Sequence, residues 1–141
     1  MTALGEVPHA APAITNDSRE FWTSGAEGKL RIFRCADCKH LIHPPVPVCR
    51  FCRSTNVAAQ VVSGQGKLYS FTVNRHPWTD SFSGPYVLGL VELDEEPGVN
   101  VLTNIIDCPL EEIKIGMPVE VSFRQYRPFG EVWLPLFRPR R

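Results

Sequence analysis

Residues 35–52 read CADCKHLIHPPVPVCRFC, and this stretch determines how the first half of the chain folds. It holds two Cys-x-x-Cys pairs separated by ten residues. Two residues between cysteines let both sulfurs of a turn face one ion at about 2.3 Å, and two such turns complete a tetrahedron. Two pairs at this spacing are a much stronger signal than one pair. We therefore expect Cys35, Cys38, Cys49 and Cys52 to hold one zinc ion in a small ribbon.

Such a site would be closed, because four sulfur ligands leave no coordination position for water. We therefore expect the zinc to be structural, and we predict no catalytic residue in the chain. A four-thiolate tetrahedron also suits iron, although nothing else here suggests electron transfer. His40 and His43 lie between the cysteine pairs and could each replace a cysteine as ligand. Cys108 stands alone and is interpreted as a small buried hydrophobe.

The composition is that of a globular protein that does not depend on nucleic-acid phosphates. Of 141 residues, 43% are hydrophobic and 21% charged, and fifteen basic side chains balance fifteen acidic ones. Nucleic-acid binding usually needs a basic excess. No apolar run of about 18 residues predicts a membrane span, and the N-terminus has no signal-peptide pattern. These features predict a cytoplasmic protein, in which paired cysteines bind metal more often than they form disulfides.

Before the cysteines, the sequence predicts a mobile tail and one short helix. Residues 1 to about 14 are rich in Ala and Pro and have no periodicity. The helix that follows contains Phe21 and Trp22 and is expected to end at Gly25 and Gly28. Two aromatic side chains on so short a helix need a surface to bury against. We expect that surface to belong either to this chain or to another protein, and we name both residues as candidate partner contacts.

After the ribbon, alternating and apolar segments predict five β-strands. They cover residues 67–74, 86–93, 99–106, 119–124 and 132–137. Tyr69 and Phe71 should share one face of the first strand, while the second strand should be covered on both faces. Pro135 predicts an edge position for the last strand, since proline cannot donate to a ladder. With a small helical element after the third strand, this order matches a five-stranded barrel of the OB type. A small sandwich is the alternative.

The fold class is thus mainly β, in three parts. Residues 1–28 form the tail and the N-terminal helix, residues 29–59 a rubredoxin-like zinc ribbon, and residues 60–141 an OB-fold barrel with a C-terminal tail. A strand over residues 29–33 is expected to lead into the first cysteine pair, and residues 53–59 are expected to be a connection.

The order of these features resembles a family first catalogued as a domain of unknown function, a zinc ribbon followed by an OB-fold, associated with acyl-CoA metabolism. The matching stretches are FWTSGAEGKLRIFRCADC, HPPVPVCRFCRS, SGQGKLYSFTVNR, PYVLGLVELDE and IKIGMPVEVSFRQY. They extend from Phe21 to Tyr126 with few gaps. The family commonly has glycine after the second cysteine of the first knuckle, where Lys39 and His40 stand here.

The resemblance implies an accessory role. Members of the family typically act as the obligate partner of a thiolase-like protein, often of the sterol carrier protein type, in thiolytic or retro-aldol cleavage of acyl-CoA, including steroid side chains. It implies that the ribbon and the helix help form the docking surface and that the barrel borders the path of the pantetheine arm. Because thiolases are usually dimers, it suggests a two-plus-two assembly.

Two further groups of residues are candidates for binding. The loop NRHPWTDSFSGP carries Trp78 and Phe82, which we expect to dock on the partner, since exposed aromatic side chains are typical interface anchors. The alternative is that they cap one end of the barrel. The C-terminal arginines, Arg138, Arg140 and Arg141, could contact the phosphates of CoA or could remain solvated.

Two other function classes stay open at this point. A single-stranded nucleic-acid module is compatible with a ribbon and an OB-fold, and Tyr69 and Phe71 occupy positions typical of base stacking. Neutral net charge argues against it. A stand-alone CoA thioesterase would need a nucleophile elbow, paired carboxylates or a similar motif, and the sequence has none.

Overall fold

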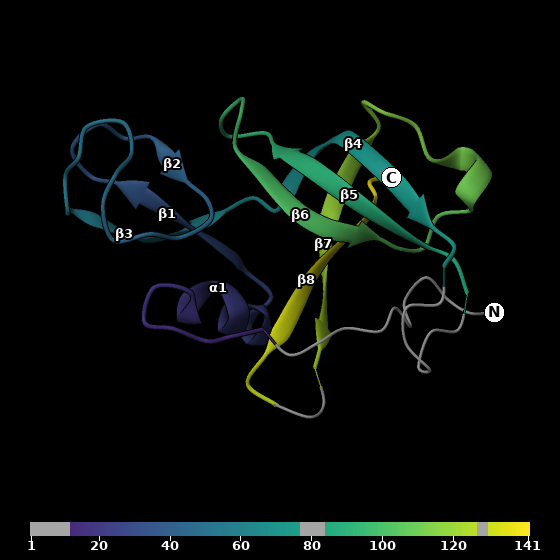
Figure 1. The fold of residues 1–141 in the computed structure, drawn as a ribbon, viewed down its shortest axis with the longest axis horizontal. Coiled ribbons are helices and arrows are strands. Elements are labelled where there is room, and N and C mark those ends of the chain that lie inside the picture. Colours follow the sequence, from purple (N-terminus) through teal and green to yellow (C-terminus); the bar gives the residue numbers. More distant parts are fainter. Residues whose placement is uncertain (1–11, 77–83, 127–129) are drawn as a thin grey trace.

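The computed structural model describes residues 12–76, 84–126 and 130–141. Figure 1 shows a three-stranded ribbon on one side and a barrel on the other, with the N-terminal helix beside their junction. The elements run in the order α1 (Arg19–Thr23), the 3-10 helix η2 (Ser24–Glu27), β1 (Leu30–Cys35), β2 (Leu41–Ile42), β3 (Val57–Val62), β4 (Gln65–Asn74), β5 (Tyr86–Leu93), β6 (Asn100–Ile105), the 3-10 helix η3 (Leu110–Glu112), β7 (Pro118–Gln125) and β8 (Trp133–Pro139). The predicted fold class, mainly β with an N-terminal helix, a ribbon and a closed five-stranded barrel, is confirmed.

The ribbon is an antiparallel sheet in the order β2-β1-β3. β1 pairs with β3 along its whole length, from Leu30↔Val62 to Cys35↔Val57. The prediction that residues 53–59 are only a connection was therefore wrong in its last three residues, which begin β3. Because β3 continues to Val62 and β4 begins at Gln65, only two residues separate the ribbon from the barrel.

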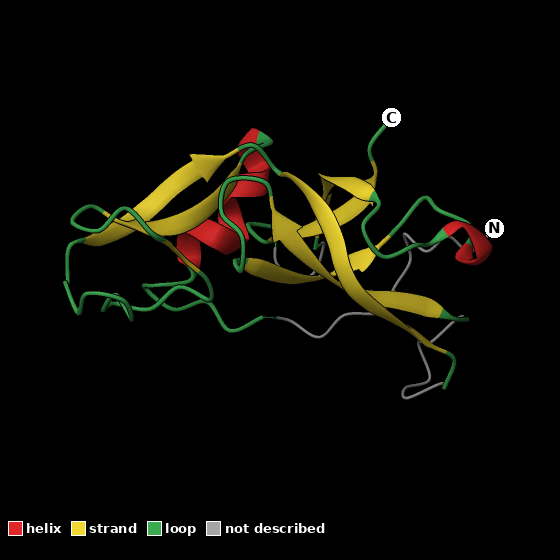
Figure 2. Ribbon diagram, turned by 90° about the horizontal axis from the view of Figure 1, so that it is seen from above, coloured by secondary structure: helices red, strands yellow, loops and turns green. Residues whose placement is uncertain are grey.

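The barrel closes in the order β4-β5-β6-β8-β7 (Figures 1 and 2). β5 alternates strictly between buried and half-buried residues, so the expectation of cover on both faces was wrong. β8 pairs antiparallel with β7 over seven residues and parallel with β6 at Ile105↔Phe137. Since β8 has a neighbour on each side at Phe137, it is not the edge strand predicted from Pro135, although Pro135 itself pairs only with β7.

A β-bulge interrupts the first barrel strand. The register of β4 against β5 shifts between Leu68 and Ser70, so the extra residue, Tyr69, leaves the ladder. Leu68 is fully buried, whereas Tyr69 is 56% exposed. Phe71 returns to the core-facing side of the strand. The prediction that Tyr69 and Phe71 share a face was therefore wrong, because a bulge reverses the alternation.

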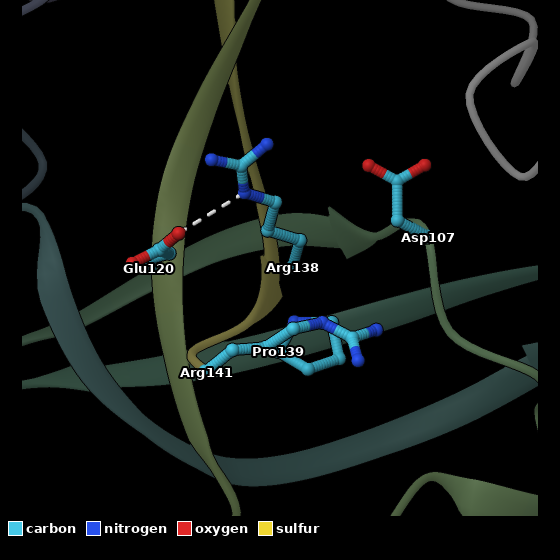
Figure 3. A pocket seen from close by; sticks show the side chains of 5 residues that line it. All are labelled: Asp107, Glu120, Arg138, Pro139 and Arg141. Atoms are coloured by element: carbon cyan, nitrogen blue, oxygen red, sulfur yellow. Dashed lines mark hydrogen bonds and ion pairs between the residues drawn. The ribbon is translucent and has the colours of Figure 1, made fainter.

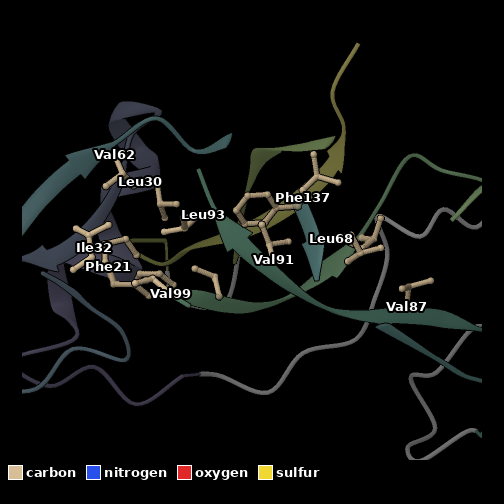
Figure 4. Close-up of a cluster of buried hydrophobic side chains, with 14 of the residues drawn as sticks. Phe21, Leu30, Ile32, Val62, Leu68, Val87, Val91, Leu93, Val99 and Phe137 are labelled. Carbon is tan, nitrogen blue, oxygen red and sulfur yellow. The ribbon is translucent and has the colours of Figure 1, made fainter. Parts of the chain in front are cut away.

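One hydrophobic core joins the helix, the ribbon and the barrel (Figure 4). Phe21 of α1 and Leu30 and Ile32 of β1 lie in the same cluster as Val91 and Phe137 of the barrel. Burial of apolar surface is the main stabilising term of a fold, so a shared core holds the three parts in a fixed arrangement. In residues 12–76, 84–126 and 130–141, no helix has the length and apolar character needed to span a bilayer.

Candidate metal centre and docking surface

The two cysteine pairs form two turns with the same hydrogen-bond pattern. In the first, the backbone N–H of Lys39 donates to the carbonyl of Cys35 at 2.9 Å, and Cys35 N–H donates to the carbonyl of His40 at 3.0 Å. In the second, Arg53 N–H donates to the Cys49 carbonyl at 2.8 Å, and Cys49 N–H donates to the Ser54 carbonyl at 2.8 Å. This pattern turns both sulfurs of each pair toward the other pair.

Each turn requires a left-handed residue directly after its second cysteine. Lys39 has φ 71° and Arg53 has φ 65°. Glycine adopts this conformation without steric cost, which explains why the family commonly places glycine at the first position. Lys39 takes this conformation without being glycine, and its turn has the same hydrogen-bond pattern as the turn at Arg53.

The four sulfurs are arranged as a metal site. All four Sγ atoms lie within 4.8 Å of one another. The Sγ atoms of Cys35 and Cys52 are 3.6 Å apart, as are those of Cys38 and Cys49. A tetrahedron with metal–sulfur bonds of about 2.3 Å has edges of about 3.8 Å, so the observed distances fit zinc. The predicted set of four cysteines is thus brought together at one point.

Backbone N–H groups point at two of these sulfurs. Cys38 N–H lies 3.5 Å from the Sγ of Cys35, and Phe51 N–H lies 3.4 Å from the Sγ of Cys49. The Cys38 N–H is the main cause that lowers the pKa of Cys35 to about 7. A thiol that loses its proton near neutral pH is ready to bind a cation, because the thiolate is the ligand.

The two histidines between the pairs have other partners. His40 Nδ1 lies 2.8 Å from a carboxylate oxygen of Glu96, and its ring stacks on Phe51 with centroids 4.0 Å apart. His43 packs against Phe21 with ring centroids 4.8 Å apart. Burial lowers the pKa of His43 to about 4, so this side chain is neutral at physiological pH.

The turn between β5 and β6 holds the ribbon to the barrel. One Glu96 oxygen accepts from Leu41 N–H at 2.9 Å, and the other contacts His40. The neighbouring Glu95 accepts from Ser63 N–H, in the link between β3 and β4, at 2.6 Å. Sequence reasoning did not identify these carboxylates, because their partners lie 32 to 56 positions away along the chain.

The candidate partner contacts divide into those inside and outside the core. Phe21 is 7% exposed and packs within the chain, whereas Trp22 is half-buried and touches the Phe21 ring edge-on at 4.8 Å. Trp22 also lines a hollow of about 90 Å³ between β6 and β8. Trp78 and Phe82 lie outside the described residues.

Two of the three C-terminal arginines line a charged hollow of about 280 Å³ (Figure 3). Arg138 and Arg141 lie there with Asp107, Glu120 and Pro139. The Nε of Arg138 donates to Glu120 at 3.1 Å. Arg140 does not line this hollow. Its guanidinium lies 2.7 Å from Gln65 and 3.5 Å from Asp94. The three arginines therefore do not form one cluster.

The ribbon and the barrel each match a known protein-family model. A family model described as the ChsH2 rubredoxin-like zinc ribbon domain matches residues 22–58, and one described as the ChsH2 C-terminal OB-fold domain matches residues 59–124. A DUF35 domain-containing scaffold protein of Pyrococcus furiosus is 40% identical over 99 residues, which are 70% of this chain and 71% of that protein. The chain belongs to the DUF35 family.

Two other similar proteins are named as parts of enzymes with more than one subunit. The DUF35 chain of a solved Ltp2-ChsH2 aldolase is 39% identical, with a TM-score of 0.80 over 92% of this chain and 98% of that chain. A probable enoyl-CoA hydratase alpha subunit of Thermomonospora curvata is 40% identical over 128 residues, or 91% of this chain. This DUF35 protein spans only 39% of the length of that relative.

Proposed function

We propose that the chain is a non-catalytic accessory subunit that binds and stabilises a thiolase-type enzyme, either a thiolase or a retro-aldolase, acting on acyl-CoA. The observation that carries this proposal is the likeness to the DUF35 chain of the Ltp2-ChsH2 aldolase, of which 98% is covered at 39% identity. A scaffold protein and a CoA hydratase subunit among the relatives support it. The acyl group would be a steroid side chain or a fatty acyl chain, and the assembly would contain two copies of each subunit.

The metal in this proposal is one structural zinc per chain, held by Cys35, Cys38, Cys49 and Cys52. When bound, it would supply the cross-link that ties the two turns together, without an open coordination position. The chain's own contribution is the fixed orientation of the ribbon, through the shared core and the Glu95 and Glu96 carboxylates. A rigid ribbon loses little conformational entropy when it docks on a larger protein.

The remaining cysteine is poorly suited to catalysis, which supports a non-enzymatic role. Cys108 is 5% exposed. Burial, followed by the nearby Glu112 carboxylate, raises the pKa of its thiol. A nucleophilic cysteine needs a lowered pKa and access for substrate, and Cys108 has neither property.

For docking, we propose that Trp22 contributes on the α1 side of the molecule and that Trp78 and Phe82 contribute from the loop between β4 and β5. Phe21 would contribute indirectly, because its ring is buried and packs against Trp22. For CoA, we propose that the barrel borders the pantetheine path and that Arg138 and Arg141 contact phosphate oxygens. Arg140 would contribute less, because it does not line the hollow that Arg138 and Arg141 share.

The ion pairs argue against the nucleic-acid alternative. Among the described residues on or next to the barrel strands, Arg124, Arg138 and Arg140 each have a carboxylate partner within 4 Å. These ion pairs reduce the free positive charge that the described part of the barrel presents. The phosphate backbone of a nucleic acid would therefore meet little free positive charge.

Co-expression tests the proposal directly. The partner would be Ltp2 of the solved aldolase, produced alone and together with this chain, and the readouts are soluble yield and acyl-CoA cleavage. We expect the partner alone to be poorly soluble or inactive, the chain alone to turn over no acyl-CoA, and the pair to elute together and be active. Full activity and solubility of the isolated partner would contradict the proposal, as would thioester cleavage by the purified chain alone.

A further inference from the structure

The barrel is not hydrogen-bonded around its whole circumference. β6 and β8 are paired only at Ile105↔Phe137, where Ile106 N–H donates to the Phe137 carbonyl at 2.8 Å. Two residues before Phe137 stands Pro135. In a parallel ladder, the next bridge would pair residues 103 and 135 and would need a bond from the N–H of residue 135 to the carbonyl of Leu102. Proline has no N–H, so the ladder stops there.

A side chain replaces part of the missing ladder. The hydroxyl of Thr103 donates to the Pro135 carbonyl at 2.9 Å. The Pro135 carbonyl is therefore satisfied, but the backbone of Leu102 is not. Figure 1 shows β8 leaving β6 beyond this point and running toward α1. The gap between the two strands is a built feature of the fold, because a single proline determines where pairing ends.

The backbone of Leu102 faces this gap. Leu93 N–H donates to the Val99 carbonyl at 3.0 Å, so residues 99, 101 and 103 direct their backbone groups to β5. Leu102, between them, directs its N–H and carbonyl to the opposite side. Within residues 12–76, 84–126 and 130–141, no strand or side chain pairs with those two groups. The Leu102 side chain is 67% exposed.

Apolar hollows lie on both sides of this open edge. The hollow of about 90 Å³ is lined by Trp22, Leu134 and Leu136 together with Leu102. On its other side, Leu102 borders a second hollow of about 260 Å³, whose lining includes Leu88 and Leu90. An added strand would place alternate side chains over the outer face beside Leu102 and into the hollow beside Trp22.

We propose that this edge of β6 accepts an extended segment of the thiolase-type partner by strand addition, with apolar residues on both faces of that segment. The proposal deepens the proposed function and rests on it. A free backbone N–H and carbonyl on one side of a strand select an extended peptide over a helix, and exposed edges of this kind are normally protected. The two hollows beside this edge are lined mainly by apolar side chains and by no charged one, which fits an apolar segment better than a charged one.

A second copy of the chain is a poorer occupant. In a pair of β6 strands, the side chains next to Leu102 would have to fill the hollow of the other copy. Val101 is fully buried and Thr103 is 6% exposed, so both side chains already point into their own barrel. Self-pairing would therefore leave the hollow beside Trp22 unfilled.

Amide hydrogen exchange, measured by NMR on the free chain and on its complex with Ltp2, tests the proposal. We expect the Leu102 amide to exchange quickly in the free chain and about 100-fold more slowly in the complex, because it gains a hydrogen bond. The Val101 amide, which faces β5, should be protected in both states and serves as the internal control.

Two variants separate the backbone from the side chain. Leu102→Pro removes an N–H that the fold does not use and should weaken Ltp2 binding at least about tenfold, while Val101 protection and the circular dichroism spectrum stay unchanged. Leu102→Thr removes the apolar side chain and should also weaken binding. Ile115→Thr is the matched control, since Ile115 is likewise 67% exposed but lies elsewhere, and it should bind as the unmodified chain does.

The possible outcomes are distinguishable. A complex in which the Leu102 amide is unprotected, or in which Leu102→Pro binds normally, overturns strand addition and leaves the proposed function standing. Absence of any complex with Ltp2 overturns both. Protection of the Leu102 amide in the free chain would also overturn the proposal. Protection that depends on concentration would mean that a second copy covers the edge, and protection that does not would mean that the chain itself covers it.

Discussion

Lys39 and Arg53 occupy a conformation that is unfavourable for any residue with a side chain. Their φ angles of 71° and 65° lie in the left-handed region, where non-glycine residues lose roughly 1 kcal/mol. Replacing either residue by glycine should therefore stabilise the metal-loaded chain by about 0.5–1 kcal/mol in the free energy of unfolding. Denaturant unfolding at constant zinc concentration measures this effect.

Ala36 supplies the control for these two variants. It lies in the same turn but does not have a positive φ. Ala36→Gly should destabilise the chain, because glycine adds only conformational freedom in the unfolded state. If Ala36→Gly and Lys39→Gly changed the free energy of unfolding equally, strain in the left-handed conformation would not explain the effect at Lys39.

His43 should make stability depend on pH. Its pKa is about 4 in the folded state because it is buried, against about 6.5 in the unfolded chain. As pH falls below 6.5, His43 binds a proton in the unfolded state but not in the folded state, so the free energy of unfolding decreases. Between pH 7.5 and 5.5 we expect a loss of about 1 kcal/mol from this group.

The measurement compares unmodified chain with His43→Leu at both pH values. Leucine cannot titrate. Lowering the pH from 7.5 to 5.5 should therefore destabilise the unmodified chain more than the variant. Protonation of the cysteines affects both proteins equally and cancels in that comparison. A difference that is the same at both pH values would rule out a neutral, buried His43.

Among the elements, η2 packs directly against β7 and β8, and Gly25 makes that contact possible. A Cβ at this position would clash with the Cβ of Trp133 and lie within 2.6 Å of the Phe123 ring. Gly25→Ala should therefore cost about 1–3 kcal/mol of stability by pushing η2 away from β7 and β8. Gly130→Ala is the control, because its Cβ would meet only Gln125 at 3.5 Å. Thermal melts that rank the two variants equally would contradict this packing.

The element boundaries show what alternation can and cannot predict. β5 was placed at residues 86–93, as observed, because a long apolar run between turn signals leaves little choice. β3 was not identified, since Ala58 and Ala59 give a weak strand signal and its pairing with β1 is distant in sequence. The bulge at Tyr69 is a local break in register, which no hydrophobic pattern reveals.

Pro135 is informative in the same way. Proline was correctly read as unable to donate to a ladder, but that property does not say which side of the strand is affected. β8 keeps its full ladder with β7 and loses only its ladder with β6. The sequence therefore contained the cause of the open edge, whereas its position required the topology.

For the molecule as a whole, the clustering of the four cysteines could be predicted and the contacts between its parts could not. Cysteine spacing is a local property, so the meeting of the four sulfurs follows from it directly. The hydrogen bonds of the Glu96 carboxylate with His40 and Leu41 join residues more than fifty positions apart. The division of the C-terminal arginines between two sites likewise depends on strand register, since Arg138 lies opposite Glu120 in the β7–β8 ladder.

Loss of one ligand should affect the ribbon more than the barrel. Cys49 is fully buried in the sulfur cluster, so Cys49→Ser should lower zinc content to near zero and unprotect the amides of β1 and β2. The amides of β5 should keep most of their protection, because the barrel has its own ladders. Cys108→Ser should retain full zinc. Equal zinc loss in both variants would contradict the assignment of ligands.

The most direct test of the account is native mass spectrometry of the purified chain, combined with a count of reactive thiols. We predict one zinc ion per chain and four thiols that react only after a chelator removes the metal, with a simultaneous loss of amide protection in the ribbon. A chain isolated without stoichiometric metal, whose ribbon amides are nevertheless fully protected, would contradict the claim that a metal-linked ribbon gives this subunit its fixed docking surface.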